Sequence, residues 1–357
     1  MKIVIAGKNG SNIHEKPLNN AFIELGHESS IFSWGIYFQK NNRNILTRLW
    51  SKIEYKLNYG IIIGYIANRL IDYIRATKPD VLFVYRGQII GARTLNKVKK
   101  IQPNIILISY NNDDPFSKYY KPYTWYKFRK SIQYYDIVLS YRPSNIEDYK
   151  NHKAKHVRLM PPWFVKDNNY NVVLKSDDVV KYKTEVVFVG HYENDGREKI
   201  LEEIVDAGIE LKLYGPEWDE IVLNNAKLKH LYPIEYLYGD EYNKALSGAK
   251  IALCIYSTLN RDVYTRRCFE IPATKTFMLA PRTQEMMEFF VDGSEAVYYD
   301  DKDDLIKKIK SYLANEDVRK KIANNGFKRC INSKYDVVGR AEVILKTVED
   351  YGSYEAY

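Results

Sequence analysis

The sequence has few cysteines and no long apolar run, and both shortages exclude classes of protein. The 357 residues include only three cysteines, without C-x-x-C spacing, at Cys254, Cys268 and Cys330. An odd number of scattered cysteines does not fit a disulfide framework, so we expect reduced thiols in a cytoplasmic protein. No apolar stretch approaches the roughly 20 residues that a membrane-spanning helix needs. The N-terminal MKIVIAGKNG is typical of a buried strand and not of a signal peptide.

Motifs of cofactor and metal sites are missing as well. The sequence has no G-x-G-x-x-G, which disfavours a nicotinamide cofactor. His152 and His156 have the i,i+4 spacing of a metal pair, but no glutamate accompanies them as in H-E-x-x-H. The acidic run at 300–304 directly precedes an amphipathic helical stretch, where carboxylates stabilise a helix N-terminus. We therefore expect neither a cofactor nor a metal ion.

The composition is that of a globular protein with two domains. Hydrophobic residues make up 45% and charged residues 28% of the chain, and the length allows two separate cores. Pro161-Pro162 opens a polar stretch, up to about Lys183, that we expect to have little regular structure. We predict an N-terminal domain over 1–165, a C-terminal domain over 184–335, and a final helix with a tail over 336–357.

Positive charge is concentrated in the first of these domains. Residues 1–165 carry 26 Lys and Arg residues against 11 Asp and Glu, while residues 166–357 carry 28 against 34. This asymmetry predicts an anionic partner for the first domain. A phospholipid surface, a lipid-pyrophosphate carrier, an acidic polysaccharide and nucleic acid all fit that description. A solubilising surface is the other interpretation, but it does not explain the asymmetry.

A strand, a glycine-containing loop and a helix follow one another at the start of each predicted domain. The strands are the apolar runs 2–6 and 184–189. The loops contain Gly7 and Gly10 in the first domain, and Gly190 in the second, where Arg197 starts the helix; a further strand over 210–214 ends at Gly215. This order predicts Rossmann-like α/β domains that present backbone N–H groups to anions. The need for tight turns also explains the glycines.

Two further strands of the first domain deliver polar residues to the edge where open α/β sheets bind ligands. Residues 80–85 lead to Arg86 and Gln88, and residues 105–109 lead to Asp113 and Asp114. A carboxylate at this edge can deprotonate the hydroxyl of an acceptor. Because Pro115 restricts the preceding residue to an extended conformation, Asp114 is slightly preferred as the base. An ordinary Asn-Asp-Pro turn is the equal alternative.

Two stretches of the first domain combine basic and apolar residues. Residues 118–130, KYYKPYTWYKFRK, interleave five cations with six aromatic residues. This pattern suits sugar rings, bases or lipid headgroups, and we take Tyr119 and Trp125 as acceptor contacts. Residues 43–76 have the pattern of a basic amphipathic helix. Such a helix can lie on a membrane or against an acceptor, but packing against its own sheet is more common, and we expect packing here.

The most informative stretch is residues 262–290, DVYTRRCFEIPATKTFMLAPRTQEMMEFF. Asp262 is expected to cap a short helix that ends near Pro272 and carries Arg266, Arg267 and Glu270 on one face. A buried strand over 276–280 follows, and Thr283 opens a second helix. A carboxylate beside two guanidinium groups suits a nucleoside diphosphate, because it accepts from ribose hydroxyls while arginine pairs with phosphate oxygens. On spacing alone, the simpler interpretation is a surface ion network.

Four short motifs in and after this stretch resemble a known family. They are R-x-F-E-x-P-A at 267–273, F-M-L at 277–279, R-T-x-E-M-x-E-F-F at 282–290 and G-x-E-x-V-x-Y at 293–299. Together they are similar to the C-terminal domain of spore-maturation CgeB-like glycosyltransferases, which belong to the GT-B class of nucleotide-sugar-dependent enzymes. Asp262 and Glu270 form D-x7-E, which resembles the E-x7-E motif of related retaining enzymes with Asp in the first place. A fainter resemblance is to phage DNA β-glucosyltransferase.

The resemblance implies a GT-B fold, in which two Rossmann-like α/β domains face each other across a cleft and a C-terminal helix crosses back to the first domain. It implies that Glu270 holds the ribose of the donor and that arginines hold its phosphates. The predicted donor site, extended over the glycine loops and helix starts, consists of Gly10, Gly190, Arg197, Gly215, Arg266, Arg267, Glu270 and Thr283. The predicted acceptor contacts are Arg86, Gln88, Tyr119 and Trp125, and the base is Asp114 or Asp113 if the anomeric centre inverts.

The predicted function is transfer of a sugar, a hexosyl unit in the first instance, from a nucleotide-sugar to an acceptor hydroxyl in surface glycan, glycolipid or glycoprotein synthesis. A UDP-sugar is favoured, and no metal is needed because arginines and helix N-termini offset the charge of the departing diphosphate. We expect a cytoplasmic enzyme, with peripheral contact at the inner membrane face as an option. Two alternatives stay open: a phage-type DNA glycosyltransferase acting on hydroxymethylated bases, and a non-catalytic module that binds sugar-nucleotides or glycans.

Overall fold

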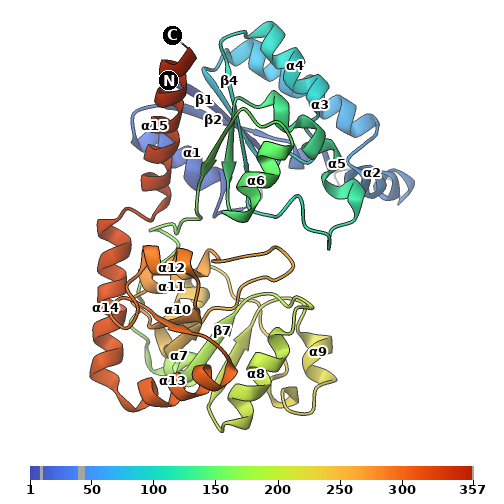
Figure 1. The fold of residues 1–357 in the computed structure, drawn as a ribbon. Coiled ribbons are helices and arrows are strands. Elements are labelled where there is room, and N and C mark those ends of the chain that lie inside the picture. The colour runs from blue at the N-terminus through green and yellow to red at the C-terminus, as the bar shows by residue number, and fades with distance from the viewer. Residues whose placement is uncertain (9–10, 39–44, 356–357) are drawn as a thin grey trace. The chain divides into compact units, whose positions relative to one another are not determined.

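A computed structural model describes residues 1–8, 11–38 and 45–355 of the chain, which form two compact units (Figure 1). Unit 1 consists of Met1–Pro161 and Val337–Tyr357, and unit 2 consists of Pro162–Asp336. Each unit contains one parallel sheet with helices packed against it. The predicted fold class, two Rossmann-like α/β domains, is confirmed.

The sheet of unit 1 has six parallel strands in the order β2-β1-β3-β4-β5-β6. Its strands are β1 (Lys2–Gly7), β2 (Glu28–Ser33), β3 (Val81–Tyr85), β4 (Ile106–Asn111), β5 (Ile137–Ser140) and β6 (His156–Leu159). Its helices are α1 (Glu15–Glu24), η1 (Gly35–Phe38), α2 (Ile45–Leu57), α3 (Ile61–Thr77), α4 (Ala92–Ile101), α5 (Pro122–Ser131), η2 (Ile132–Tyr134), α6 (Ser144–Asn151) and α15 (Val337–Glu355). Apolar runs such as VLFVY in β3, which is buried throughout, form strands that are covered on both faces. Helices α1 and α15 lie on one face, and α3 and α4 on the other (Figure 1).

The sheet of unit 2 has five parallel strands in the order β11-β10-β9-β7-β8. Its strands are β7 (Thr184–Val189), β8 (Leu211–Tyr214), β9 (Ala249–Leu253), β10 (Met278–Pro281) and β11 (Val297–Tyr299). Its helices are α7 (Ser176–Tyr182), α8 (Arg197–Asp206), α9 (Asp219–Leu223), η3 (Lys229–Leu231), α10 (Asp240–Gly248), α11 (Arg267–Ala273), α12 (Gln284–Phe289), α13 (Lys302–Ala314) and α14 (Glu316–Asn332). The three cysteines are buried and free.

The structure departs from the predicted elements in three places. The polar stretch after Pro161 is more ordered than predicted, since it belongs to unit 2 and contains α7. Helix α11 begins at Arg267, five residues after Asp262, so Asp262 does not cap it, whereas its end at Ala273 lies near Pro272 as predicted. The sequence does not predict strand β2, because its run ESSIFS is mostly polar. In the structure this run forms a strand at the edge of the sheet.

The C-terminal helix returns to unit 1, as the GT-B resemblance implies. It extends over Val337–Glu355 and lies beside α1 (Figure 1). This helix therefore belongs to the first unit although it follows the whole of unit 2 in the chain.

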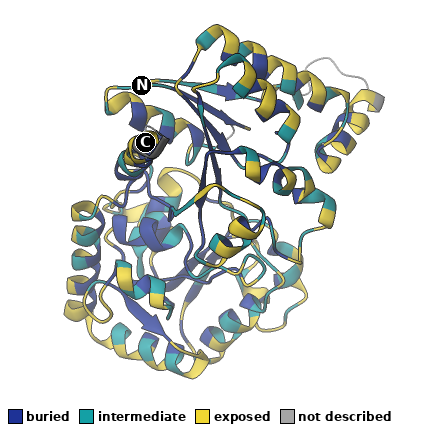
Figure 2. Ribbon diagram, turned by 45° about the horizontal axis from the view of Figure 1, so that its top comes forward, coloured by how far each residue is buried: buried dark blue, intermediate teal, exposed yellow. Residues whose placement is uncertain are grey.

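The predicted helical stretch 43–76 is two helices with different surroundings. Asn58 and Gly60 have φ values of 53° and 141°, which separate α2 from α3. Helix α3 buries an apolar stripe in the core of unit 1: Ile63, Ile66, Leu70, Ile71 and Ile74. Most apolar side chains of α2 are exposed instead. The prediction that this stretch packs against its own sheet is therefore right for α3 and wrong for α2. Only α3 turns its apolar side to the strands, which are buried and dark blue in Figure 2.

None of the helices in the described part of the chain combines the length and the apolarity that a bilayer crossing requires.

Asp136, the residue before β5, fixes the middle of the sheet of unit 1. Its buried carboxylate accepts a hydrogen bond from the Leu107 N–H of β4 at 2.9 Å, from Lys99 Nζ at 2.7 Å and from Lys155 Nζ at 2.9 Å. Burial by itself would raise the pKa of Asp136, but these hydrogen bonds outweigh burial and hold the pKa below its usual value.

Asp136→Asn should lower the free energy of unfolding at pH 7 by about 2–4 kcal/mol, because the two lysines lose their anionic partner. The folded pKa lies below the unfolded one, so the stabilisation is present above the ordinary Asp value of 3.8 and is lost as the pH falls through the lower folded value. Urea denaturation of both proteins should therefore show a difference at pH 7 that shrinks in acid.

Asp72→Asn, on the exposed side of α3, is the control for this measurement. Asp72 has a side chain that is 51% exposed and pairs with Arg75 at i,i+3, so its loss should cost less than about 0.5 kcal/mol. An Asp136→Asn effect no larger than this would contradict the assignment.

Candidate functional site

Two glycine loops meet at the carboxyl ends of β7 and β8 in unit 2. The Gly190 N–H donates to the Tyr214 carbonyl at 2.9 Å, and the Trp218 indole donates to the Gly190 carbonyl at 2.8 Å. Gly215 has a φ of 135°, and a Cβ at this position would lie 2.2 Å from the Gly190 carbonyl oxygen. Only glycine allows this close approach of the two loops. The predicted site residues Gly190 and Gly215 are therefore neighbours.

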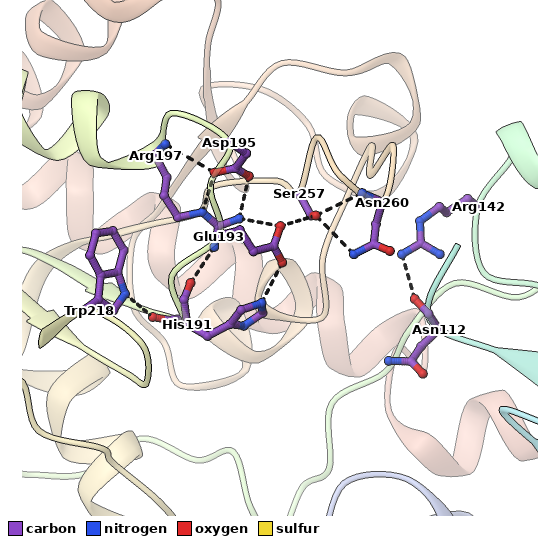
Figure 3. A network of polar contacts seen from close by, with 10 residues as sticks. Asn112, Arg142, His191, Glu193, Asp195, Arg197, Trp218, Ser257 and Asn260 are labelled. Carbon is purple, nitrogen blue, oxygen red and sulfur yellow. Dashed lines mark hydrogen bonds and ion pairs between the residues drawn. The ribbon is translucent and has the colours of Figure 1, made fainter. Parts of the chain in front are cut away.

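The guanidinium of Arg197, at the start of α8, holds the loop that leads to it. Its Nε and Nη2 donate to the two carboxylate oxygens of Asp195, both at 2.7 Å, and Nη1 donates to the His191 carbonyl at 2.6 Å. Nη2 also lies 3.0 Å from Glu193 Oε2. Arg197 is only 2% exposed, and Figure 3 shows its guanidinium among these partners. Contact with donor phosphates, which we predict for Arg197, stays a prediction.

Glu193 extends this network to the segment that follows β9. Its carboxylate lies 2.7 Å from His191 Nε2 and accepts a hydrogen bond from the Ser257 hydroxyl (Figure 3). Burial would raise the pKa of Glu193, but the hydrogen bonds from His191 and Ser257 and the charge of Arg197 outweigh burial, so the pKa lies below its usual value. Glu193 is thus an anionic partner inside the loop.

Arg267 lies beside the same loop, but without an acidic partner. A Cβ built on Gly190 would lie 3.3 Å from its Cζ, and the Cζ is 5.9 Å from the centre of the Phe188 ring. Its Nε is buried and makes no hydrogen bond in the described part of the chain, where no ion pair of Arg267 occurs either. Arg197 and Arg266 are both paired with carboxylates. Arg267 is therefore the cation beside the glycine loops whose charge no carboxylate of the described residues neutralises.

Glu270, on α11, is buried and held from two sides. Its Oε1 lies 2.7 Å from Arg266 Nε, and its Oε2 accepts a hydrogen bond from the Tyr242 hydroxyl at 2.8 Å. Burial raises the pKa of Tyr242 well above its usual value, and the charge of Glu270 raises it further, so the phenol keeps its proton. The predicted group of Arg266, Arg267 and Glu270 is present at the start of α11, and so is the i,i+4 ion pair of the simpler interpretation.

One predicted donor residue, Thr283, has a structural role of its own. Thr283 is the N-cap of α12, where its hydroxyl accepts from the Met286 N–H at 3.2 Å and donates to the Val263 carbonyl at 2.8 Å. It joins α12 to the loop before α11 in this way. Gly10 lies outside the described residues.

In unit 1, a pocket of about 310 Å³ opens where β1 and β3 end. Its lining is aromatic, cationic and polar: Lys8, Ser11, His14, Glu15, Trp34, Tyr55, Tyr85, Arg86, Gln88, Ile89 and Asn112. The His14 ring stacks on Tyr85 with 4.8 Å between the ring centres, and Lys8 Nζ lies 4.9 Å from the centre of the Tyr55 ring. Aromatic faces beside cations suit a sugar ring that carries anionic groups.

Arg86, which lines this pocket, forms an ion pair through its Nη2 with Oδ2 of Asp113, the residue after the lining residue Asn112. Arg86 has a φ of 63° and Gly87 a φ of 40°. A left-handed conformation is uncommon for arginine and occurs most often at functional sites. The structure thus brings together a predicted acceptor contact and one of the two predicted bases, and it places Gln88 in the lining of the pocket.

Asp114 and Trp125 are buried away from solvent. Asp114 is 0% exposed, and its Oδ1 accepts from the Phe116 N–H at 2.9 Å and from Asn145 Nδ2 at 2.8 Å. Asp114 therefore closes a turn, and Asp113 becomes the preferred candidate for the base. Trp125 is 1% exposed in the core of unit 1, which leaves no face for an acceptor. Our assignment of Trp125 is therefore corrected, whereas Tyr119 is exposed.

Several side chains of these sites were not among the predicted residues. Tyr242 reaches Glu270 from α10, and Tyr55 reaches the unit 1 pocket from α2, over distances along the chain that no motif spans. Glu193 and Asp195 do carry a signal, because two acids in a glycine loop that ends in arginine can pair with it internally.

One family model matches part of the chain. Residues 197–346 match a family model described as glycosyl transferase-like. The chain carries a glycosyltransferase-like domain. This match is in line with the predicted enzyme class over residues 197–346 and does not reach the narrower CgeB-like assignment. A comparison with curated proteins gives no match.

Solved structures with the same fold cover nearly the whole chain. A sucrose-phosphate synthase from Thermosynechococcus elongatus has a TM-score of 0.70 at 12% identity and covers 99% of this chain and 100% of its own. A glycosyltransferase from Rickettsia africae ESF-5 has 0.67 at 14%, covering 98% of both chains. Anabaena HepE in complex with UDP-glucose has 0.65 at 11%, covering 98% of this chain and 100% of its own. At these identities the likeness shows the fold.

Arg197→Ala and Arg267→Ala should differ sharply in their effect on stability. Arg197→Ala leaves Asp195 and Glu193 without their cation and should lower the free energy of unfolding by about 3–5 kcal/mol. Arg267→Ala removes no ion pair and should cost less than about 1 kcal/mol. Urea denaturation at pH 7 measures both, and equal losses would show that Arg267 is as structural as Arg197.

Proposed function

We propose that the protein is a glycosyltransferase that moves a sugar, a hexosyl unit in the first instance, from a UDP-sugar to an acceptor hydroxyl. Unit 2 binds the donor, and unit 1 binds the acceptor. The match of residues 197–346 to a glycosyl transferase-like model supports the reaction class. HepE, one of the structural neighbours, is described in complex with UDP-glucose, which supports a uridine nucleotide.

The observation that carries the proposal is the unpaired cation beside the glycine loops. Arg267 lies against Gly190, without a carboxylate among the described residues, at the beginning of the loop that leads to the N-terminus of α8. A diphosphate placed there gains a charged hydrogen-bond partner and a helix N-terminus, and both offset the negative charge that develops when it departs. Arg267 and the helix N-terminus can offset this charge without a metal ion, and we propose metal-independent transfer.

Glu270 is the proposed ribose contact. Its carboxylate is already oriented by Arg266 and Tyr242, so no side chain has to reorganise before it accepts from ribose hydroxyls. Besides its predicted contact with the phosphates, Arg197 holds the loop of residues 190–196 in the shape that the diphosphate meets.

Asp113 is the proposed base of an inverting transfer. The acceptor hydroxyl attacks the anomeric carbon as the bond to the diphosphate breaks, and the Asp113 carboxylate takes the hydroxyl proton. Arg86, paired with Asp113, and Gln88, in the same pocket, orient the acceptor. We place this enzyme in the CgeB-like group and in the cytoplasm.

Arg267→Ala and Glu270→Ala test the donor site. We expect each to weaken UDP binding by roughly 1–3 kcal/mol, because a charged hydrogen bond is lost. Calorimetric titration should show that Arg267→Ala affects UDP more than uridine, since uridine has no phosphate, whereas Glu270→Ala affects both. Lys275→Ala removes a cation just after the other end of α11 and should bind UDP like the wild type. Unchanged affinity in a folded Glu270→Ala protein would refute the ribose assignment.

The reaction itself is tested by screening nucleotide-sugars for hydrolysis and transfer. Acceptors should include glycans, lipid-linked sugars and duplex DNA with hydroxymethylated bases. Transfer to the DNA alone would favour the phage-type alternative, and donor binding without turnover would favour a non-catalytic module.

Once an acceptor is found, Asp113→Asn should cut turnover by roughly 10²–10⁴-fold with nearly unchanged donor affinity, because the proton acceptor is removed. Asp114→Asn should keep near-normal turnover in the folded fraction. Near-normal rates for both variants would leave the loop as a turn and favour a retaining mechanism.

A further inference from the structure

Helix α2 buries polar side chains and exposes apolar ones. Its polar residues Ser51 and Glu54 are buried, as is Asn58 directly after it. Its apolar residues point to solvent, with exposed fractions from 47% to 76% for Leu57, Ile53, Leu49, Trp50 and Ile45. A helix at the surface of a soluble domain has the opposite arrangement. The exposed apolar side of α2 therefore needs an explanation other than packing within unit 1.

The buried polar residues fix α2 firmly in this orientation. Glu54 accepts from the N–H groups of Ile61 at 3.0 Å and Ile62 at 2.7 Å, and so caps the N-terminus of α3. The Trp50 indole donates to the same carboxylate at 2.7 Å, and Asn58 Nδ2 donates to the Thr124 carbonyl of α5 at 2.9 Å. These bonds turn the apolar side outward.

The exposed apolar surface continues beyond α2. Tyr59 and Ile61, in and after the turn between α2 and α3, are 77% and 81% exposed. Lys127 Nζ of α5 lies 5.8 Å from the centre of the Tyr59 ring, which joins α5 to this surface; Figure 1 shows α2 and α5 together at one end of unit 1. We call the exposed residues Ile45, Leu49, Trp50, Ile53, Leu57, Tyr59 and Ile61 the α2 face.

The charges around the α2 face have one sign. Arg48, Lys52 and Lys56 are exposed on α2, and the only acid between residues 45 and 71 is the buried Glu54. Lys118, Lys121 and Lys130 are exposed on and before α5. A second copy of the chain would bring these cations against each other, whereas an anionic surface would neutralise them.

We propose that the α2 face binds the surface of an anionic phospholipid membrane. The helix lies flat in the interface, with its apolar side chains in the headgroup and acyl boundary and its lysines at the lipid phosphates. Trp50 and Tyr59 have an apolar ring and a polar end, which is the character of side chains that concentrate at this depth. The contact is independent of the transfer reaction, and it would hold unit 1 against the membrane.

Cosedimentation with phospholipid vesicles tests the proposal. The full-length protein should bind vesicles of phosphatidylglycerol mixed with phosphatidylcholine, bind phosphatidylcholine alone much more weakly, and be released by about 0.5 M NaCl, because salt screens the phosphate contacts. Leu49→Gln with Ile53→Gln should lower the partition coefficient by about tenfold or more, since two apolar side chains are lost. Lys52→Gln with Lys56→Gln should lower it by a similar factor on anionic vesicles only.

Val173→Gln with Val180→Gln is the matched control. These valines are 88% and 84% exposed in unit 2, so the same chemical change should leave vesicle binding intact. Thermal unfolding should be unchanged in all three double variants, because the altered side chains are exposed.

Three results would overturn the proposal. One is equal binding to neutral and anionic vesicles, and another is vesicle binding by Leu49→Gln with Ile53→Gln at the wild-type level. The third is a wild-type dimer in light scattering that this variant dissociates, which would make the α2 face an interface between copies.

Discussion

The contact between the Gly190 and Gly215 backbones is the constraint on which the site of unit 2 depends. A side chain at Gly215 would overlap the Gly190 carbonyl, so the two loops can meet only without one. The same carbonyl accepts from Trp218, which ties it to the core. With the loop anchored at this end, Arg197 fixes the rest of it through Asp195 and Glu193. The loop is therefore ordered before any ligand arrives, which lowers the entropy that binding must overcome.

This internal pairing explains why neighbouring arginines have different roles. Arg197 and Arg266 each face a carboxylate at 2.7 Å, and their charges are neutralised within the unit. Arg267 follows Arg266 directly, yet on a helix the next residue points about 100° away, toward Gly190. Arg267 is half-buried and its Nε is buried; a partly desolvated cation without a carboxylate carries a cost, and such a cost is commonly kept at a site where a ligand supplies the missing charge.

Unit 1 shows the same separation between residues that maintain structure and residues that face a pocket. Asp114 is used by the backbone of its own turn, while Asp113, one residue earlier, pairs with Arg86 at the pocket. Glu54 follows the first pattern on α2, since it caps α3 and thereby turns a row of apolar side chains to solvent. In both places the hydrogen bonds of one buried carboxylate, Asp114 or Glu54, set the orientation of the side chains next to it.

The sequence by itself determined the class of fold, the position of several strands along the chain and the loops that carry polar residues, because apolar period, glycine position and strand ends are local properties. It also placed Arg266, Arg267 and Glu270 together, since four residues are one helical turn. Which arginine is paired, which aspartate is buried and which side of α2 faces water were decided only by the tertiary structure. Those outcomes depend on partners far along the chain, such as Tyr242 for Glu270, Arg86 for Asp113 and Thr124 for Asn58. No local pattern encodes such distant partners, because burial and charge pairing are set by what the fold brings together.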